Sequence, residues 1–221
     1  HDPGRAGDSR RQAWAPWGTP VSAAAGFSEL LGPHAGGCAL DRLTRYAELL
    51  ERWAARHNLV RFSSREELVE RHLLDALAAT PLLEGGGKLL DVGSGAGLPG
   101  VPLLAVRPEW HGVLLEPRQK RWAFLRAVVR ELDLNADVVR SRYQDLPPGR
   151  QYDRITVRAV GGHPELFEWA RGRLTESGEI LVWTTIDGLA MVEDLEGWRV
   201  LSSQLPGLES GRLARLQPCF T

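Results

Sequence analysis

A chain of 221 residues with 43% hydrophobic and 25% charged residues has the composition of one globular domain, which excludes a fibre, a peptide and a largely disordered protein. Its 27 basic and 28 acidic residues give a net charge of -1, so contact with a polyanion would need a local basic patch. No apolar run approaches the roughly 18 to 20 residues of a membrane span and no segment resembles a secretory signal, so we expect a cytoplasmic protein without a membrane partner.

The composition of the chain changes twice along its length. Residues 1–37 are rich in Gly, Pro, Ala and Ser and lack sustained periodicity, so we expect a disordered arm there. Residues 38–84 show helical periodicity and are expected to form an N-terminal helical extension. In residues 85–221 short apolar runs alternate with helical stretches, which predicts a main domain that forms one structural unit with the extension.

Two helices are predicted in the extension. Apolar residues recur every three or four positions from about Leu40 to Asn58, as in an amphipathic helix. Ser63 and Ser64 are each followed three residues later by glutamate, which is typical of a capping box at the start of a second helix. A further apolar stripe extends this helix to about Thr80.

The main domain is predicted to alternate strands with helices. The predicted strands are Lys88–Val92, Gly112–Glu116, Asp137–Arg140, Tyr152–Val157 and Ile180–Thr184. The predicted helices are Pro99–Val106, Pro117–Leu132 and Pro164–Leu174. This alternation predicts a doubly wound, mostly parallel, Rossmann-like α/β sheet with helices on both faces. Two last strands, Gly197–Gln204 and Arg212–Gln217, are expected to form an antiparallel C-terminal hairpin.

A glycine-rich loop follows the first predicted strand, where an open α/β sheet binds its ligands. Gly93, Gly95 and Gly97 allow the backbone to approach a ligand closely. Gly95, Gly97 and Gly100 also fit the dinucleotide pattern GxGxxG, which is weak evidence by itself. Because Pro99 fits a helix only within its first turn, the next helix begins near it and leaves a wide loop rather than a tight pyrophosphate turn.

An acidic residue, Glu116, ends the second predicted strand, 23 residues after Gly93. A carboxylate there can accept hydrogen bonds from both ribose hydroxyls of an adenosine, each worth about 1.5 to 3 kcal/mol. We therefore predict that Glu116 binds a ribose and is not merely a solvated surface charge. Asp91 either contacts the ligand or fixes the loop by accepting backbone N–H bonds, and we favour the second interpretation.

The glycine loop and its acid resemble motifs of class I S-adenosylmethionine-dependent methyltransferases. An ordered series of segments resembles the glucose-inhibited division protein B family, which comprises bacterial 16S rRNA guanine-N7 methyltransferases. The resemblance covers roughly Leu40–Thr184. The segments are His72-Leu73-Leu74-Asp75, the run Asp91–Val101, Lys120-Arg121 with Phe124-Leu125, Ser141-Arg142, and Tyr152-Asp153 followed by Arg158-Ala159.

This resemblance implies that S-adenosyl-L-methionine is the cofactor and that the partner is 16S rRNA or the small ribosomal subunit. We also expect a monomer. It implies a methyltransferase sheet with a cofactor site at its carboxyl edge. The implied cofactor residues are Gly93, Gly95, Gly97, Leu98, Glu116, Tyr143, Gln144 and Arg158. Arg158 would lie near the methyl-donor end or the target base; the alternative is a surface ion pair with an acid such as Glu165.

The implied chemistry needs no catalytic base. Guanine N7 carries a free lone pair and no proton, so alignment and a pocket that tolerates the new positive charge suffice. We therefore expect no catalytic residue beyond positioning groups, of which Arg158 is a candidate. His72, on an apolar helical stripe, is interpreted as a structural or orienting residue.

RNA would be bound by charge in the part of the chain from Arg118 to Arg158, which holds ten basic and five acidic residues. Residues 176–209 instead hold one basic and seven acidic residues. The candidate phosphate contacts are Lys120, Arg121, Arg126 and Arg142, with Arg158, Arg56 and His57 as further candidates. Trp122, Phe124 and Leu125 are expected in the core rather than as platforms for stacked bases.

Three positions depart from the family pattern and keep other functions open. Gln144 stands where an acid is common, Trp183-Thr184-Thr185 where Lys-Gly is usual, and Arg212-Leu213 where Arg-His is usual. The alternatives are a diverged methyltransferase for a small molecule or protein, an NAD-dependent oxidoreductase, and a non-catalytic cofactor-binding module.

The chain's two cysteines, Cys38 and Cys219, lie far apart in the sequence, and neither has a second thiol nearby. This placement predicts neither a disulfide framework nor a cysteine-built zinc site. We therefore expect no metal.

Overall fold

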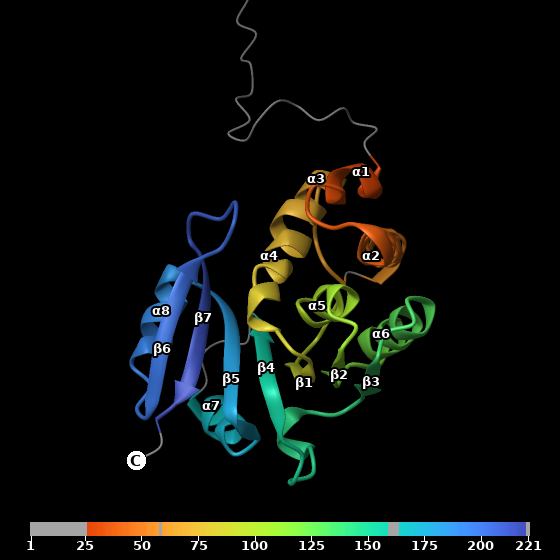
Figure 1. The fold of residues 1–221 in the computed structure, drawn as a ribbon. Coiled ribbons are helices and arrows are strands. Elements are labelled where there is room, and N and C mark those ends of the chain that lie inside the picture. The colour runs from red at the N-terminus through yellow and green to blue at the C-terminus, as the bar shows by residue number, and fades with distance from the viewer. Residues whose placement is uncertain (1–25, 58, 159–163, 220–221) are drawn as a thin grey trace, which may run out of the picture.

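A computed structural model describes residues 26–57, 59–158 and 164–219, and for residues 55–57 it describes only the backbone. The described strands form one sheet in the order β3-β2-β1-β4-β5-β7-β6 (Figure 1). These strands are β1 (Gly87–Val92), β2 (Trp110–Leu115), β3 (Ala136–Val139), β4 (Tyr152–Arg158), β5 (Leu174–Thr185), β6 (Trp198–Gln204) and β7 (Gly211–Pro218).

The pairing of the strands confirms the predicted mixed α/β sheet. The pairs β1–β2, β1–β4, β2–β3 and β4–β5 are parallel, whereas β7 is antiparallel to both β5 and β6. The chain order reverses beside β1, which has β2 on one side and β4 on the other. In open α/β sheets such a switch point opens a crevice at the carboxyl ends of the strands.

Helices lie on both sides of the sheet, and among the described ones none is long and apolar enough to cross a membrane (Figure 1). The helices are α1 (Phe27–Leu31), α2 (Gly37–His57), α3 (Arg65–Leu68), α4 (Leu74–Leu77), α5 (Gly100–Val106), α6 (Gln119–Glu131), α7 (Pro164–Arg171) and α8 (Ile186–Glu193). A π-helical turn, η1 (Val69–Leu73), joins α3 to α4, and two 3-10 turns are η2 (Thr80–Leu82) and η3 (Tyr143–Asp145).

Two hydrophobic clusters fill the space between the sheet and its helices. Neighbouring residues of a strand point to opposite faces, so Leu89 belongs to one cluster and Leu90 to the other. The first cluster contains buried side chains of α1, α2, α5 and α6, and the second contains those of α7 and α8. The helical extension therefore shares its core with one face of the sheet.

The first part of the chain is more ordered than we predicted. Residues 1–25 of the expected disordered arm lie outside the described residues, but residues 26–36 include helix α1. The expectation was wrong there because Phe27 and Leu31, 3% and 0% exposed, pack into the first cluster. Packing of one apolar helical face outweighs the glycine and proline content around it.

The second helix of the extension begins as its capping box predicts. The Ser64 side chain accepts a hydrogen bond from the backbone N–H of Glu67, and the Glu67 carboxylate in turn accepts from the backbone N–H of Ser63. The helix then passes through the π-helical turn η1, which no sequence pattern predicted. This turn carries His72 and leads directly to Asp75 in α4.

The structure differs from the sequence-based prediction at two further elements, β5 and α8. Strand β5 begins at Leu174, earlier than predicted. Leu174 is paired with Tyr152 and Glu179 with Arg154, so the residues of β5 between Leu174 and Glu179 form an irregularity in its pairing with β4. Helix α8 was not predicted; the Thr185 side chain caps it by accepting a hydrogen bond from the backbone N–H of Gly188 at 3.2 Å.

Candidate active site

Loops that follow neighbouring strands meet at the carboxyl edge of the sheet. The Ser94 backbone N–H donates to the carbonyl of Leu115 at 2.9 Å, and the Glu116 backbone N–H donates to the carbonyl of Val139 at 3.1 Å. These bonds bring the glycine loop after β1 beside the end of β2, and the end of β2 beside that of β3. Three segments that are far apart in the sequence thus form one continuous rim.

The glycine loop adopts a backbone that other residues avoid. Gly93, Gly95 and Gly97 have φ values of +72°, +58° and +94°. A Cβ on Gly97 would lie 2.7 Å from Cγ2 of Val101 in α5 and 3.1 Å from the hydroxyl of Tyr46. Glycine is therefore required at this position both by backbone conformation and by packing.

Glu116 lies directly after β2, 3% exposed, with its carboxylate against the glycine loop. One carboxylate oxygen accepts from the backbone N–H of Gly95 at 3.0 Å, and the other accepts from the N–H of Arg118 at 2.8 Å. Each oxygen has a second lone pair for a further donor. The structure thus brings together Glu116 and the loop that the sequence associated with it.

Asp91, the penultimate residue of β1, is buried and hydrogen-bonded to the neighbouring strand β4. Its Oδ1 accepts from the hydroxyl of Thr156 in β4 at 2.8 Å. Its Oδ2 lies toward Gly100, where an added Cβ would be 2.6 Å away. Burial raises the pKa of Asp91 to about 6, although hydrogen bonds from Thr156, Ser94 and the Gly100 backbone lower it.

We expect Asp91→Asn to become more stable relative to the parent protein as the pH rises. The raised pKa means that the folded state binds the proton more tightly than the unfolded state, so ionisation costs stability as the pH rises through the interval from about 4 to about 6. Between about pH 5 and about pH 7.5 the difference in free energy of unfolding should move by about 1 kcal/mol in favour of the variant. Urea unfolding at both pH values measures this change.

Comparison with the parent at each pH cancels the contributions of other titrating groups. Asp194→Asn is the matched control, because this carboxylate is exposed at the end of α8. A stability difference for Asp91→Asn that is the same at both pH values would contradict a raised pKa.

Arg158 ends β4 and forms an ion pair with Asp75 of α4, with 2.9 Å between Nη2 and Oδ2. The same Nη2 lies 3.3 Å from the carbonyl oxygen of Arg71 and 3.5 Å from Nδ1 of His72. The suggested ion pair with Glu165 was wrong, because the π-helical turn η1 and α4 supply all three of these partners. Burial, opposed by the charge of Arg158, raises the pKa of Asp75 to about 6.

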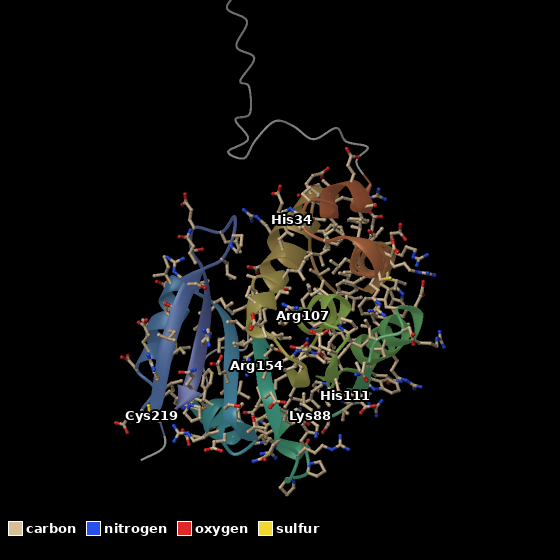
Figure 2. The ribbon with its side chains drawn as sticks, viewed as in Figure 1. His34, Lys88, Arg107, His111, Arg154 and Cys219 are labelled. Carbon is tan, nitrogen blue, oxygen red and sulfur yellow. The ribbon has the colours of Figure 1, made fainter. Side chains whose placement is uncertain are left out.

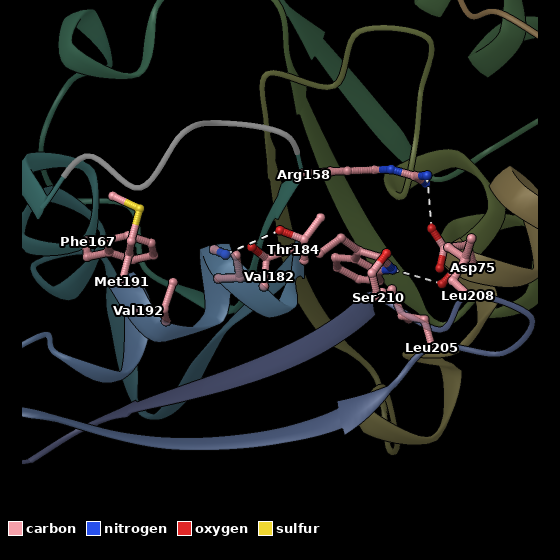
Figure 3. A pocket seen from close by; sticks show the side chains of 14 residues that line it. Asp75, Arg158, Phe167, Val182, Thr184, Met191, Val192, Leu205, Leu208 and Ser210 are labelled. Atoms are coloured by element: carbon pink, nitrogen blue, oxygen red, sulfur yellow. Dashed lines mark hydrogen bonds and ion pairs between the residues drawn. The ribbon is translucent and has the colours of Figure 1, made fainter.

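A cavity of about 520 Å³ extends from the Asp75–Arg158 pair along the end of β5 to helix α8 (Figure 3). Arg158 and Asp75 lie at one end, and Phe167, Met191 and Val192 lie at the other (Figure 3). Its volume is within the range of small-molecule sites. The sequence did not predict Asp75 as a lining residue, although the segment from His72 to Asp75 is one of those that carry the resemblance.

The remaining predicted cofactor residues occupy different environments along the rim. Leu98 is buried at 9% exposure beside the glycine loop, whereas Gln144 is exposed. Tyr143 packs edge-on against Trp169 of α7, with 5.1 Å between ring centroids. The Tyr143 ring is therefore part of the second hydrophobic cluster, while the backbone of η3 follows β3 at the same rim.

The predicted basic contacts lie on and around α6. Lys120, Arg126 and Arg142 are exposed, and Arg121 is half-buried, with its Nη1 3.6 Å from the position of a Cβ on Gly95. Arg56 and His57 have side chains outside the described residues. Lys88 and His111 instead lie near the amino ends of β1 and β2, at the lower edge of the sheet (Figure 2).

Of the three residues of α6 that were predicted to lie in the core, two are buried. Phe124 and Leu125 are 0% exposed. Trp122 is only half-buried, and Arg126 and Arg140 lie over its ring, with the guanidinium carbons 4.9 and 5.9 Å from the centroid. Its indole N–H donates to the carbonyl of Val138, which fixes the ring against β3.

Comparison with known proteins connects this geometry to a family. A family model described as rRNA small subunit methyltransferase G, GidB, matches residues 39–194. The Ribosomal RNA small subunit methyltransferase G of Chromobacterium violaceum is 35% identical over 178 residues, which are 78% of this chain and 85% of that protein. Its namesake from Mycobacterium sp. (strain JLS) is 38% identical over 169 residues, 75% and 74% of the two chains.

A solved structure shows the same fold at lower sequence identity. A SAM dependent methyltransferase from Aquifex aeolicus superposes with a TM-score of 0.57 at 16% identity, and the match covers 68% of this chain and 92% of that chain. At this identity the likeness concerns the fold alone.

Proposed function

The chain belongs to the rRNA small subunit methyltransferase G family, and from this membership we propose that it transfers a methyl group from S-adenosyl-L-methionine to N7 of a guanosine in 16S rRNA. The observation that carries the proposal is the buried Glu116 carboxylate, which faces Gly95 at the end of β2. Family membership favours this function over a methyltransferase for a small molecule or protein, an NAD-dependent oxidoreductase and a non-catalytic module.

The residues present fit the proposed cofactor. Glu116 offers a free lone pair on each oxygen to the ribose hydroxyls, and Gly95 beside it has no Cβ to obstruct the approach of a ligand. We propose that the cofactor is bound by residues of the rim, and that Arg158 lies toward its methyl-donor end. The rim residues are Gly93, Gly95, Gly97, Leu98, Glu116, Tyr143 and Gln144.

The methyl transfer needs orientation rather than proton transfer. When bound, the cofactor supplies an electrophilic methyl group on a positively charged sulfur. Guanine N7 has a lone pair and no proton, so the protein has only to align it with that methyl group and exclude water. His72 is therefore not needed as a base. Its ring lies between the Arg61 carbonyl and Arg158, and burial, then the charge of Arg158, lowers its pKa, which favours the neutral ring.

Transfer of a tritium-labelled methyl group tests the function. The acceptors are small subunits, or their 16S RNA, from a strain that lacks this modification, and the labelled RNA is digested to nucleosides. We expect label in 7-methylguanosine. Label in another nucleoside, or transfer to protein only, would refute the proposed substrate.

We propose that the exposed basic residues near α6 contact RNA phosphates, and Arg142→Ala tests this most simply. The variant is expected to bind the small subunit more weakly and to reduce the slope of log affinity against log salt by about 0.7 to 0.9. Filter binding over a range of salt concentrations measures the slope. Arg199→Ala is the matched control, because Arg199 is exposed on β6 in the acidic part of the sequence. Equal slopes for both variants would contradict a phosphate contact at Arg142.

We also propose that the chain acts as a monomer in the cytoplasm, where its substrate is assembled. Few large hydrophobic side chains of the described residues are well exposed, which supports a monomer. Among the described residues, the exposed ones are Ile186, Met191 and Leu201, on α8 and β6.

A further inference from the structure

The Asp75–Arg158 pair is buried but incompletely satisfied. The Asp75 side chain is 3% exposed and that of Arg158 is 21% exposed. Oδ1 of Asp75 and Nη1 of Arg158 are shielded from solvent, and neither has a hydrogen-bond partner among the described residues. A buried carboxylate oxygen and a buried guanidinium nitrogen without partners are costly, and the two residues that carry them line one end of the cavity, which points to a ligand there.

The strand register places Arg158 next to both the glycine loop and the cavity. Val92, which precedes the glycine loop, is paired with Val157, so Arg158 begins beside the loop. On its other side Arg158 is paired with Trp183 of β5, whose side chain lines the cavity. A group at this end of the cavity would therefore lie next to the proposed methyl-donor end.

The unpartnered atoms present one acceptor and one donor. Oδ1 of Asp75 can only accept while the carboxyl group is ionised, and Nη1 of Arg158 can only donate. The Watson–Crick edge of guanine is the complement, with donors at N1 and N2 and an acceptor at O6. Adenine has an acceptor at N1 and no oxygen at C6. The N1 lone pair of adenine would therefore face the carboxylate oxygen, which can only accept.

We infer that Asp75 and Arg158 read the acceptor base: Asp75 Oδ1 accepts from N1–H and N2–H of guanine, and Arg158 Nη1 donates to O6. This inference rests on the proposed function and assigns guanine selectivity to two residues. Recognition through the Watson–Crick edge leaves the N7 lone pair free for methyl transfer. It requires an unpaired base, as in other enzymes that read a base taken out of its stack.

The surroundings of Asp75 hold the acceptor in place. The Trp183 indole N–H donates to the backbone carbonyl of Asp75 at 2.8 Å, which ties α4 to the end of β5. The His72 ring and the Arg71 carbonyl hold Nη2 of Arg158, which leaves Nη1 for another acceptor. The cavity beside the pair, at about 520 Å³, has room for a purine nucleoside.

Nucleotide binding to the unsubstituted protein tests the inference without any variant. Saturation-transfer NMR is recorded with S-adenosylhomocysteine present and with GMP, 1-methyl-GMP or AMP at millimolar concentration. Because each base-edge contact discriminates by about 10- to 100-fold, GMP should bind at least about 10-fold more tightly than the other two. Equal binding of GMP and 1-methyl-GMP, or no binding of GMP, would overturn the inference.

Asp75→Asn tests the residue itself, and Asp187→Asn is the matched control, an exposed aspartate on α8 near the same cavity. The Asp75 variant should lose the preference for GMP over AMP and slow single-turnover methyl transfer about 10- to 100-fold, with unchanged affinity for S-adenosylhomocysteine. The control should keep both properties.

The outcomes separate this inference from the proposed function. If the unsubstituted protein forms no 7-methylguanosine, the proposed function fails. If it forms that product and Asp75→Asn is as fast and as selective as the parent, the function stands and Asp75 does not read the base. If the Asp75 variant has lost affinity for S-adenosylhomocysteine, its transfer rate no longer reports on the base alone, and the comparison of GMP with 1-methyl-GMP on the parent then decides.

Discussion

Replacement of Glu116 by glutamine is expected to weaken the binding of S-adenosylhomocysteine by about 100-fold, as expected when charge-assisted hydrogen bonds to two hydroxyls are lost. The carboxylate of Glu116 accepts from the backbone N–H groups of Gly95 and Arg118. Glutamine keeps the length of the side chain but turns an N–H₂ group toward one of those donors. Isothermal calorimetry measures the change in affinity.

Glu116 also has a second, structural role, because the hydrogen bonds that it accepts from Gly95 and Arg118 hold the glycine loop in place. The relative affinities for adenosine and 2′-deoxyadenosine distinguish ribose binding from the structural role. If Glu116 binds the ribose, the parent prefers adenosine and the variant loses that preference; if it only holds the loop, the variant binds both less tightly and keeps the preference. Glu131→Gln, a partly exposed acid at the far end of α6, is the control and should bind like the parent.

Gly97→Ala is expected to destabilise the protein by about 2 to 5 kcal/mol and to abolish detectable cofactor binding. Alanine is strained at φ +94°, and its Cβ would lie 2.7 Å from Val101. The nearby Tyr46 hydroxyl, which donates to the carbonyl of Ala96 at 2.7 Å, would also have to move. Denaturant unfolding measures the loss of stability, and calorimetry measures the binding.

A second glycine separates the two causes of this effect. Gly149 has φ +99°, but a Cβ there would meet nothing within 4 Å. Gly149→Ala therefore carries the backbone strain without the clash and should cost about 1 to 2 kcal/mol. Equal losses for the two variants would show that packing around Gly97 contributes nothing.

Much of the fold follows from local sequence patterns. The helix after the glycine loop begins at Gly100, directly after Pro99, as the proline predicts. Alternation along the strands and capping at Ser64 also give nearly correct boundaries. These features depend on residues close together in the sequence, so they can be read without knowledge of the packing.

The features that sequence patterns missed depend on contacts between distant segments. Helix α1 is stabilised by the burial of Phe27 and Leu31 against other helices. The early start of β5 lies beyond an irregularity in its pairing with β4. Helix α8 is short and contains Gly188, although Thr185 before it was a usable signal for a cap.

The residues of the candidate site also divide into those that local sequence predicts and those that depend on contacts between distant segments. The glycine loop and Glu116 follow from the order of strand, loop and strand, and the structure brings them into hydrogen-bond contact. The partner of Arg158 could not be identified in this way, because Asp75 belongs to the helical extension and reaches β4 only through the packing of α4. Glu165, which is close to Arg158 in the sequence, was the wrong partner for that reason.

A crystal structure with S-adenosylhomocysteine tests the central claim most directly. We expect both ribose hydroxyls to lie within hydrogen-bond distance of the Glu116 carboxylate, with the sulfur directed toward Arg158. A ligand bound at the opposite edge of the sheet, or a ribose that faces a residue other than Glu116, would contradict it.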